Sequence, residues 1–370
     1  MASRLRTLFA CCQYVALSAL LLFVPPCQSQ PVRVVSAPGQ QAATTFTMVR
    51  TAEELRDGSI VVIDRRERRV DRVWFDRDTS VQIGRAGSGP LEIAYPVRLL
   101  NLGRGRVAID DASNERWLVI GANGTLEKPF ALGEPTSLNY IARRSSGIPT
   151  STGSVMYASA RRGGDVIAEW FPNASEPREV SRRAPPLLRA GAAPSGVSAR
   201  ASGTSAPPYL SPADYWTAAL DGQVAVVTGS PYRVTFFSLD GAQKQSSIMT
   251  VPAQMLTRRT REEMVLELAR QRGDQAPRDG RYDWPDVLPA IHGDAFSTIR
   301  FAPDGKLWVR RTTLAESLPA FDVFSRDATI SERVRLPAKS RLAGFGAAHL
   351  LLVVRDDDDV EYIRRVPFKY

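Results

Sequence analysis

The sequence predicts an all-β fold, a six-bladed β-propeller with one helical insertion, and three observations favour it. Short runs of β-branched and aromatic residues, separated by turn residues, recur along most of the chain. Where the recurrence is regular, the units begin about 45 residues apart, and a period of about 40 to 50 residues is typical of propeller blades. A separate strand-like run at residues 31–37 precedes the first unit and could complete the last one.

The clearest unit lies between Asp57 and Pro90. The turn pair Asp57-Gly58 is followed by a β-branched run from Ile60 to Ile63 and, after a basic turn, by a second run from Val70 to Phe75. Two short runs with a turn between them indicate adjacent antiparallel strands. The first apolar residues of the successive units are Ile60, Val107, Val155, Val224, Leu307 and Leu351.

The last unit ends after its third strand. We therefore expect the run at 31–37 to pair beside residues 360–366 and so to join the two ends of the chain. The mature protein, residues 30–370, is then one propeller domain.

Two spacings are longer than the rest and predict insertions at about 184–212 and about 253–295. The first is rich in Ala, Pro, Ser and Gly and lacks apolar periodicity, which predicts a loop. The second contains a helix, expected from Arg261 to Arg272. Thr260 to Glu263 has the pattern of a capping box, and Met264, Val265 and Leu268 share one helical face.

The N-terminus predicts a signal peptide over residues 1–29. Arg4 and Arg6 precede an apolar run at about 14–24, which Pro25-Pro26 ends. This run is about half of the ~20 residues that a membrane span needs, so no integral membrane span is expected. We expect a periplasmic or secreted protein.

All three cysteines, Cys11, Cys12 and Cys27, lie in or beside this signal. A mature chain without cysteine has no disulfide, so its core must hold the fold alone. Lipid attachment at Cys27 is a less favoured alternative, because Val24-Pro25-Pro26 departs from the residues that usually precede such a cysteine.

The chain has 48 basic and 39 acidic residues, a formal net charge of +9. The basic residues are scattered, and no basic run is interleaved with aromatic residues as in a nucleic-acid-binding face. We expect no nucleic-acid partner.

Four stretches carry a resemblance to a family. DGSIVVID, DGKLWVRR, IGRAGSGPLEI and WPDVLPAI resemble six-bladed β-propellers of the NHL and TolB-like kind, which are common among exported bacterial proteins. In the third stretch, Leu91 and Ile93 stand where relatives typically have glycine and phenylalanine. The resemblance implies the fold and an exported protein, but no particular chemistry, because propellers host unrelated functions.

The sequence offers few catalytic candidates. It has no Gly-x-Ser-x-Gly elbow and no Walker loop, and the mature chain has only His292 and His349, too few for a multi-histidine metal site. Four acidic residues at Asp356–Asp359 could suggest calcium, but consecutive carboxylates between two strands are more typical of a solvated hairpin tip. We expect no cofactor and no metal.

Trp74, Trp117, Trp170 and Trp308 fall inside the repeats and are expected to pack between blades. The candidate binding face consists of the residues beside the insertions, Trp216, Trp284, Arg261 and His292.

These observations favour a monomeric, non-catalytic recognition module for a peptide, glycan or protein partner. The alternative is a calcium-dependent lactonase-like or esterase-like hydrolase, so the sequence leaves open whether the protein is an enzyme.

Overall fold

The chain divides into two units, Met1–Pro31 and Val32–Tyr370, and all elements named below belong to the second. In the part of the chain that the structure describes, no helix is long and apolar enough to cross a membrane. The computed structural model describes residues 30–36, 38–114, 116–127, 148–151, 154–161, 164–170, 178–181, 210, 214–272, 285–293, 295–314 and 317–370.

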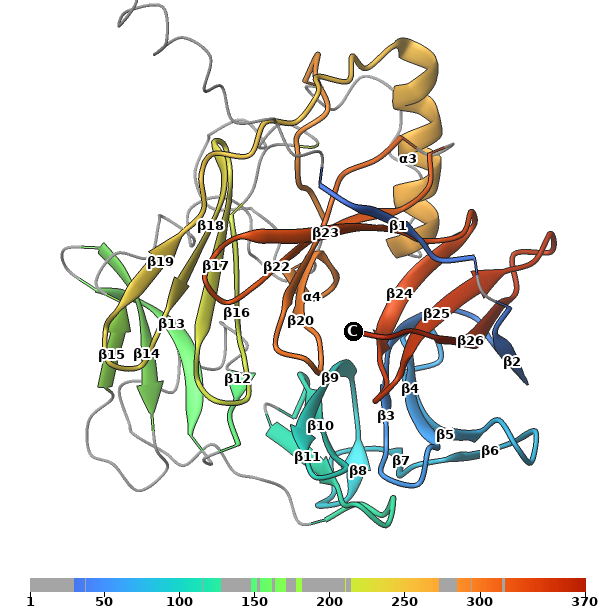
Figure 1. The fold of residues 1–370 in the computed structure, drawn as a ribbon. Helices are drawn as coiled ribbons and strands as arrows, with labels where there is room; N and C mark the ends of the chain where they lie inside the picture. Colours follow the sequence, from blue (N-terminus) through green and yellow to red (C-terminus); the bar gives the residue numbers. More distant parts are fainter. Residues whose placement is uncertain are drawn as a thin grey trace, which may run out of the picture. The chain divides into compact units, whose positions relative to one another are not determined.

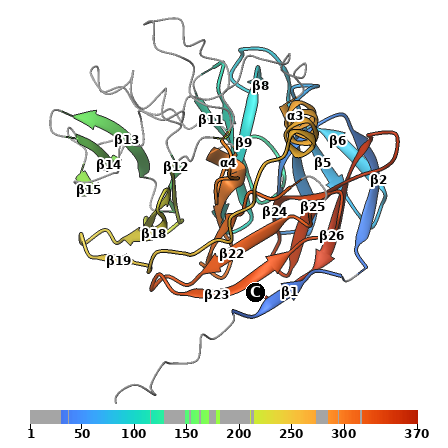
Figure 2. The same cartoon turned by 90° about the horizontal axis from the view of Figure 1, so that it is seen from above.

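The second unit is an all-β arrangement of sheets in the manner of a β-propeller (Figures 1 and 2). In chain order, the first three sheets consist of β3 (Val49–Glu54), β4 (Ile60–Asp64), β5 (Arg69–Trp74) and β6 (Thr79–Gln82); of β9 (Pro96–Gly103), β10 (Arg106–Asp111) and β11 (Arg116–Ile120); and of β12 (Ile148–Pro149), β13 (Val155–Arg161), β14 (Gly164–Trp170) and β15 (Arg178–Ser181).

The next three sheets consist of β16 (Tyr215–Ala218), β17 (Val224–Gly229), β18 (Tyr232–Phe237) and β19 (Gln243–Gln245); of β20 (Ile299–Phe301), β21 (Leu307–Arg310), β22 (Ala320–Phe324) and β23 (Ile330–Arg335), joined by β1 (Val32–Val34); and of β24 (Ser340–Phe345), β25 (His349–Arg355) and β26 (Glu361–Pro367), joined by β2 (Gln40–Phe46). A small parallel pair, β7 (Arg85–Ala86) and β8 (Glu92–Ile93), follows β6.

The prediction of six blades is wrong, because in the described residues only five sheets have the four or five strands of a blade. The sheet of β9 to β11 has three. After β11 the chain turns at Gly124 and runs back beside β11. In this segment Leu126 forms an isolated bridge to Ile120 and not a fourth strand. Residues 128–147, which come next, lie outside the described part.

The prediction that residues 31–37 close the ring beside 360–366 is also wrong. β1 instead pairs in parallel with β23, with Val32 opposite Arg333. The strand that pairs with β26 is β2, with Gln40 opposite Arg365 and Phe46 opposite Glu361. The N-terminal and C-terminal parts of the chain therefore do meet in one sheet, but the N-terminal strand is β2 and not residues 31–37.

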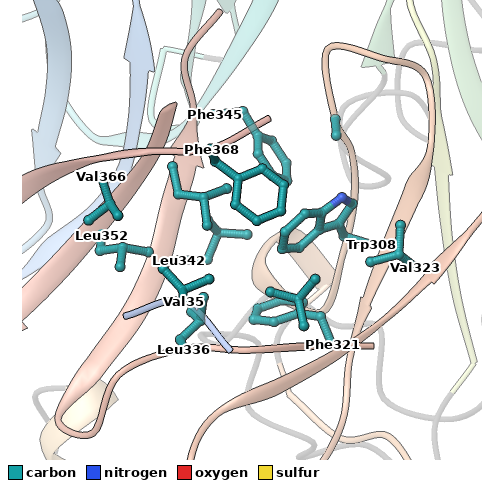
Figure 3. Packing of buried hydrophobic residues seen from close by; sticks show 13 residues of the cluster. Val35, Trp308, Phe321, Val323, Leu336, Leu342, Phe345, Leu352, Val366 and Phe368 are labelled. Carbon is teal, nitrogen blue, oxygen red and sulfur yellow. The ribbon is translucent and has the colours of Figure 1, made fainter. Parts of the chain in front are cut away.

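The core lies between the sheets, and the largest aromatic group joins the fifth and sixth (Figure 3). The Trp308 ring lies 5.6 Å from Phe321, 5.3 Å from Phe345 and 5.4 Å from Phe368, measured between centroids. Trp308 is 1% exposed, as expected of a tryptophan that packs between blades. Val35, just after β1, joins this cluster, so the N-terminal segment contributes to the core.

The helix of the second insertion, α3, spans Arg258–Arg272 and ends where predicted. Its cap differs from the prediction, since Thr257 Oγ1 accepts a hydrogen bond from Thr260 N over 3.2 Å and Thr257 is therefore the N-cap. Met264 is buried with Leu210, Leu256 and Leu288, which fixes the helix to the flanking chain. A short helix, α4 (Ala295–Thr298), precedes β20.

Candidate functional site

The first strands of neighbouring sheets bring polar side chains together. β24 contacts β3, and β3 contacts β9. Arg300, on β20, reaches across this group: Nη1 donates to the Ala343 carbonyl on β24, and Nη2 donates to Thr51 Oγ1 on β3 over 2.7 Å. Thr51 Oγ1 in turn donates to the Ala343 carbonyl over 3.1 Å. One arginine thus connects three sheets.

Glycine makes this close approach possible. A Cβ at Gly344, on β24, would overlap the Ala52 carbonyl oxygen on β3. Any larger residue would push the two strands apart at the point where Arg300 spans them. The sequence Ala343-Gly344 therefore sets the spacing of β24 and β3.

Glu53, the neighbour of Ala52 on β3, is the most perturbed carboxyl of this group. It is 9% exposed, and its carboxylate accepts a hydrogen bond from the Asn101 side chain on β9. Burial disfavours the charged form and raises the pKa to about 7, against the lowering effects of Arg300 and Asn101. A carboxyl that exchanges its proton near neutral pH is a candidate functional group.

A second arginine, which is buried, lies in the same region. Arg98, on β9, is 6% exposed, and its Nη2 lies 3.3 Å from Asp110 Oδ2. Its guanidinium carbon lies 5.0 Å from the centroid of the Trp117 ring. Burial lowers the pKa of Arg98, and the positive charge of Arg300 adds to this lowering, so the two guanidinium groups are close enough to repel.

The residues of this group do not fit a calcium ion. Calcium takes about six to eight oxygen ligands. Here the side chains of Glu53 and Asn101 offer such oxygens, but the guanidinium groups of Arg98 and Arg300 lie close enough to repel a cation. Within the described residues, no three His, Cys, Asp or Glu side chains gather as a metal site would require.

The acidic run at Asp356–Asp359 forms the turn between β25 and β26, and its carboxylates have separate partners. Asp356 accepts from the Asp358 and Val360 amides over 3.0 and 2.9 Å. Asp357 pairs with Lys339 over 2.7 Å. This is the arrangement expected of a hairpin tip.

The candidate binding residues fall on two separate parts of the fold. Trp216, on β16, is half-buried and packs against the cluster of Ile148 and Val226. His292 is also half-buried, and its carbonyl accepts from Arg310 Nη2 over 3.4 Å. The residues beside them are linked, since the Gly293 amide donates to the Tyr215 hydroxyl over 3.0 Å.

Arg261 lies on α3, where Nη2 is 3.3 Å from Asp286 Oδ1. The same insertion carries exposed apolar side chains: Met255 is 63% exposed and Val287 40%, and Leu266, on another face of α3, is 52% exposed. Met255 and Val287 are bridge partners. We call Met255, Arg261, Leu266 and Val287 the α3 surface. Trp284, the fourth candidate, lies outside the described residues.

The group around Glu53 was not found from the sequence. Its signal is a pair of acidic residues inside the strand-like run Thr51-Ala52-Glu53-Glu54, where a half-buried sheet usually alternates apolar and polar residues. Arg300 gives a similar signal between Ile299 and Phe301. Neither residue reveals by itself that the other is its neighbour.

No protein-family model and no curated protein sequence matches the chain. Among solved structures, it is similar to a protein of Bacteroides fragilis thought to be exported, with 11% identity over 92% of this chain and 99% of that chain and a TM-score of 0.47. It is also similar to an inactive form of virginiamycin B lyase from Staphylococcus aureus, with 10% identity over 89% and 99% of the two chains and a TM-score of 0.42. It is similar as well to a gluconolactonase of Xanthomonas campestris, with 11% identity over 93% of this chain and 99% of that chain and a TM-score of 0.43. Likenesses this distant say nothing of substrate or mechanism.

Proposed function

We propose that the protein is an exported, non-catalytic recognition module that binds a protein partner at the α3 surface. The observation that supports this is the exposure of Met255 and Val287, which are bridge partners, and of Leu266 on α3. Exposed apolar side chains that gather on one surface mark interaction sites more often than isolated ones do. The ion pair of Arg261 with Asp286 gives a partner polar contacts near the exposed apolar side chains.

The α3 surface stands on a fixed support, which favours binding. Met264 and Leu256 are buried beneath the helix, and Leu256 N donates to the Asp286 carbonyl over 2.8 Å. The return bond, from Leu288 N to the Gln254 carbonyl, is also 2.8 Å. Insertions held on a rigid scaffold are where binding residues are commonly placed.

Substitution of the exposed residues tests this proposal. Met255→Glu and Leu266→Glu each place a charge on an exposed side chain and should abolish cross-linking of the purified protein to a partner from the compartment in which it is found. Ile248→Glu is the matched control, because Ile248 is 54% exposed and lies outside the α3 surface. Retention of the same cross-linked partner by both α3 variants contradicts the proposal.

Export is tested separately. The N-terminus of protein recovered from the periplasm or medium should lie near Gln30. An acylated N-terminal Cys27 would show a lipid anchor instead, and an N-terminus at Met1 or Ala2 would contradict cleavage.

A hydrolase that acts at the group around Glu53 is the second candidate, and the observation that favours it is the pKa of about 7 of this buried carboxyl. Turnover of lactones or esters by the purified protein, lost in Glu53→Gln, would support it and overturn the non-catalytic proposal. Addition of EDTA tells whether such turnover needs a metal. No turnover of either substrate class is expected.

A further inference from the structure

Three arginines lie at one end of the first strands of two sheets, and in the described part of the chain none of them has an ion-pair partner. Arg56 follows β3, Arg104 lies in the turn between β9 and β10, and Arg106 begins β10. All three side chains are exposed. We call Arg56, Arg104 and Arg106 the arginine rim.

Gly105 brings the two parts of the arginine rim together. A Cβ at this position would overlap the Arg56 Cβ and lie 3.0 Å from the Arg56 backbone nitrogen. The φ of Gly105, +76°, also favours glycine. The turn after β9 thus lies directly against the residue after β3, and three long cationic side chains start from one small area.

Exposure by itself does not leave an arginine of this protein unpaired. The Arg258 and Arg259 side chains on α3 are 89% and 82% exposed, and each pairs with a glutamate four residues later. The Arg85 side chain is 84% exposed and pairs with Glu92 over 2.7 Å. The arginine rim differs from these arginines in having no acidic partner.

The acidic residues in the turns at the same end of the sheets are already engaged. Glu54, two residues before Arg56, accepts a hydrogen bond from the Ala347 amide over 2.6 Å. In the turns between the first and second strands, each aspartate has a basic partner: Asp57 pairs with Arg72, Asp221 with Arg326 and Asp304 with Lys306. An anion from outside the chain would therefore be the partner that complements the arginine rim.

The arginine rim lies on the opposite face of the propeller from α3. Neighbouring strands within its sheets are antiparallel, so the turns between first and second strands share one face, and the segments that lead from the fourth strand to the next sheet share the other. α3 belongs to such a segment, between β19 and β20. The arginine rim is thus a surface separate from the α3 surface.

The shape of this end favours a compact anion over an extended acidic segment. The turns of neighbouring sheets converge here: a Cβ at Gly103 would lie 3.7 Å from the Leu220 side chain, and the Ser151 amide donates to the Leu220 carbonyl over 2.8 Å. The three cations are therefore grouped around one turn and are not spread along the edge of a strand.

The chemistry of the guanidinium group favours phosphate. Its planar fork of donors matches two oxygens of a phosphate or a carboxylate. A phosphate monoester carries a charge of about −1.5 to −2 at pH 7 and three strong acceptor oxygens, whereas a carboxylate carries one charge and two oxygens. Three guanidinium groups around one turn match the phosphate better in both charge and number of acceptors.

We propose that the arginine rim binds a phosphate group, whose oxygens accept hydrogen bonds from Arg56, Arg104 and Arg106. A soluble phosphorylated compound and a phospholipid headgroup both carry this group, and the experiment separates the two sources. Since the arginine rim and the α3 surface share no residue, either proposal can fail while the other holds.

The probes are phenyl phosphate and benzoate, which share a ring and differ in the anion. Isothermal titration calorimetry of the full mature protein in low salt should show saturable binding of phenyl phosphate, and benzoate should bind about tenfold more weakly. Arg56→Gln, Arg104→Gln and Arg106→Gln should each weaken phenyl phosphate binding about tenfold, because each removes a charge-assisted hydrogen bond. Arg258→Gln is the matched control: it removes the same charge from an exposed side chain on α3 and should bind as the wild type does.

Thermal unfolding supplies a second readout. Phenyl phosphate should raise the Tm of the wild type and leave that of the triple variant unchanged, because a ligand stabilises only a folded state that binds it. The Tm without ligand shows that the variants are folded.

Cosedimentation with vesicles of phosphatidylcholine and phosphatidic acid identifies the source. Capture of the wild type and not of the triple variant assigns the site to a lipid headgroup, and phenyl phosphate binding without capture assigns it to a soluble compound. The proposal is overturned if the wild type does not bind phenyl phosphate saturably, if benzoate binds equally well, or if Arg258→Gln weakens binding as much as the three variants of the arginine rim do.

Discussion

Arg300 and Thr51 are 249 residues apart in the chain, yet Arg300 Nη2 donates to Thr51 Oγ1 over 2.7 Å. The same guanidinium donates to the Ala343 carbonyl. The fifth, sixth and first sheets are therefore joined by one side chain.

Replacement of this arginine should destabilise the fold. Arg300→Met keeps much of the volume but removes the donor to Thr51 Oγ1 and one of the two donors to the Ala343 carbonyl, and loss of a hydrogen bond to buried groups costs about 1–3 kcal/mol. Urea unfolding followed by circular dichroism measures this loss. Arg326→Met is the control, because Arg326 pairs with Asp221 where both side chains are at least 42% exposed, and such pairs contribute about 0–1 kcal/mol. Equal losses for both variants would contradict the role assigned to Arg300.

Loss of the Glu53 proton should lower the free energy of unfolding as the pH rises. The folded pKa of about 7 lies above the ordinary value of 4.5 for this side chain. The folded state therefore binds the proton more tightly than the unfolded state does, and this contribution is full below pH 4.5 and lost by about pH 7. At ~1.4 kcal/mol per pKa unit, the change is on the order of 3 kcal/mol. Glu53→Gln should lack this slope in urea unfolding at pH 4 to 8, and an unchanged slope would show that Glu53 is not its source.

Gly344→Ala should be strongly destabilising, because the new Cβ would overlap the Ala52 carbonyl oxygen and force β24 away from β3. We expect a loss of about 3 kcal/mol or more in the free energy of unfolding. Gly241→Ala is the comparison: a Cβ added at Gly241 would meet nothing within 4 Å, and only the φ of 86° disfavours alanine there, at about 1 kcal/mol. If the two losses are alike, the close approach of the strands is not what requires glycine at position 344.

Truncation should separate the roles of the two N-terminal strands. A chain that starts at Gln40 lacks β1 and keeps β2, and it should still unfold in one cooperative transition. A chain that starts at Met48 lacks β2 as well, which removes the buried Ala42 and Phe46 and uncovers the edge of β26. Loss of a buried Phe alone costs about 3–5 kcal/mol. Size-exclusion chromatography and thermal unfolding should show an aggregated or unfolded second chain, and a folded one would contradict closure by β2.

The strands of the repeats were predictable because their apolar runs are continuous. Ile60–Asp64 is buried at every position, and the continuous apolar run Ile-Val-Val-Ile predicts such a buried strand. β2 was missed for the opposite reason: in Gln40–Phe46 only Ala42 and Phe46 are buried, and the Gln, Ala and Thr residues around them give no apolar pattern. Residues 31–37 looked more strand-like, although only Val35 of its valines is buried.

The group around Glu53 could not be predicted, because its members come from four strands and acquire their properties only by proximity. Burial raises the pKa of Glu53, and no property of the sequence near Glu53 shows that Asn101 and Arg300 are its neighbours. The N-cap of α3 is a local error of a different kind. Thr257 and Thr260 both suit the cap chemically, and the geometry of the chain before the helix selects the first.

The pairing of β2 with β26 also sets the order in which the protein can fold. Gln40 Oε1 accepts from Arg365 Nη2 over 2.8 Å, although the two residues are 325 apart. During synthesis β2 emerges first and its partner last, so the sixth sheet cannot form until nearly the whole chain has been made. Contacts this distant in sequence slow folding, because the chain must lose loop entropy before they form. The sixth sheet is therefore the last to be completed, although the sheets of β3–β6, β9–β11, β12–β15 and β16–β19 contain neither β2 nor β26.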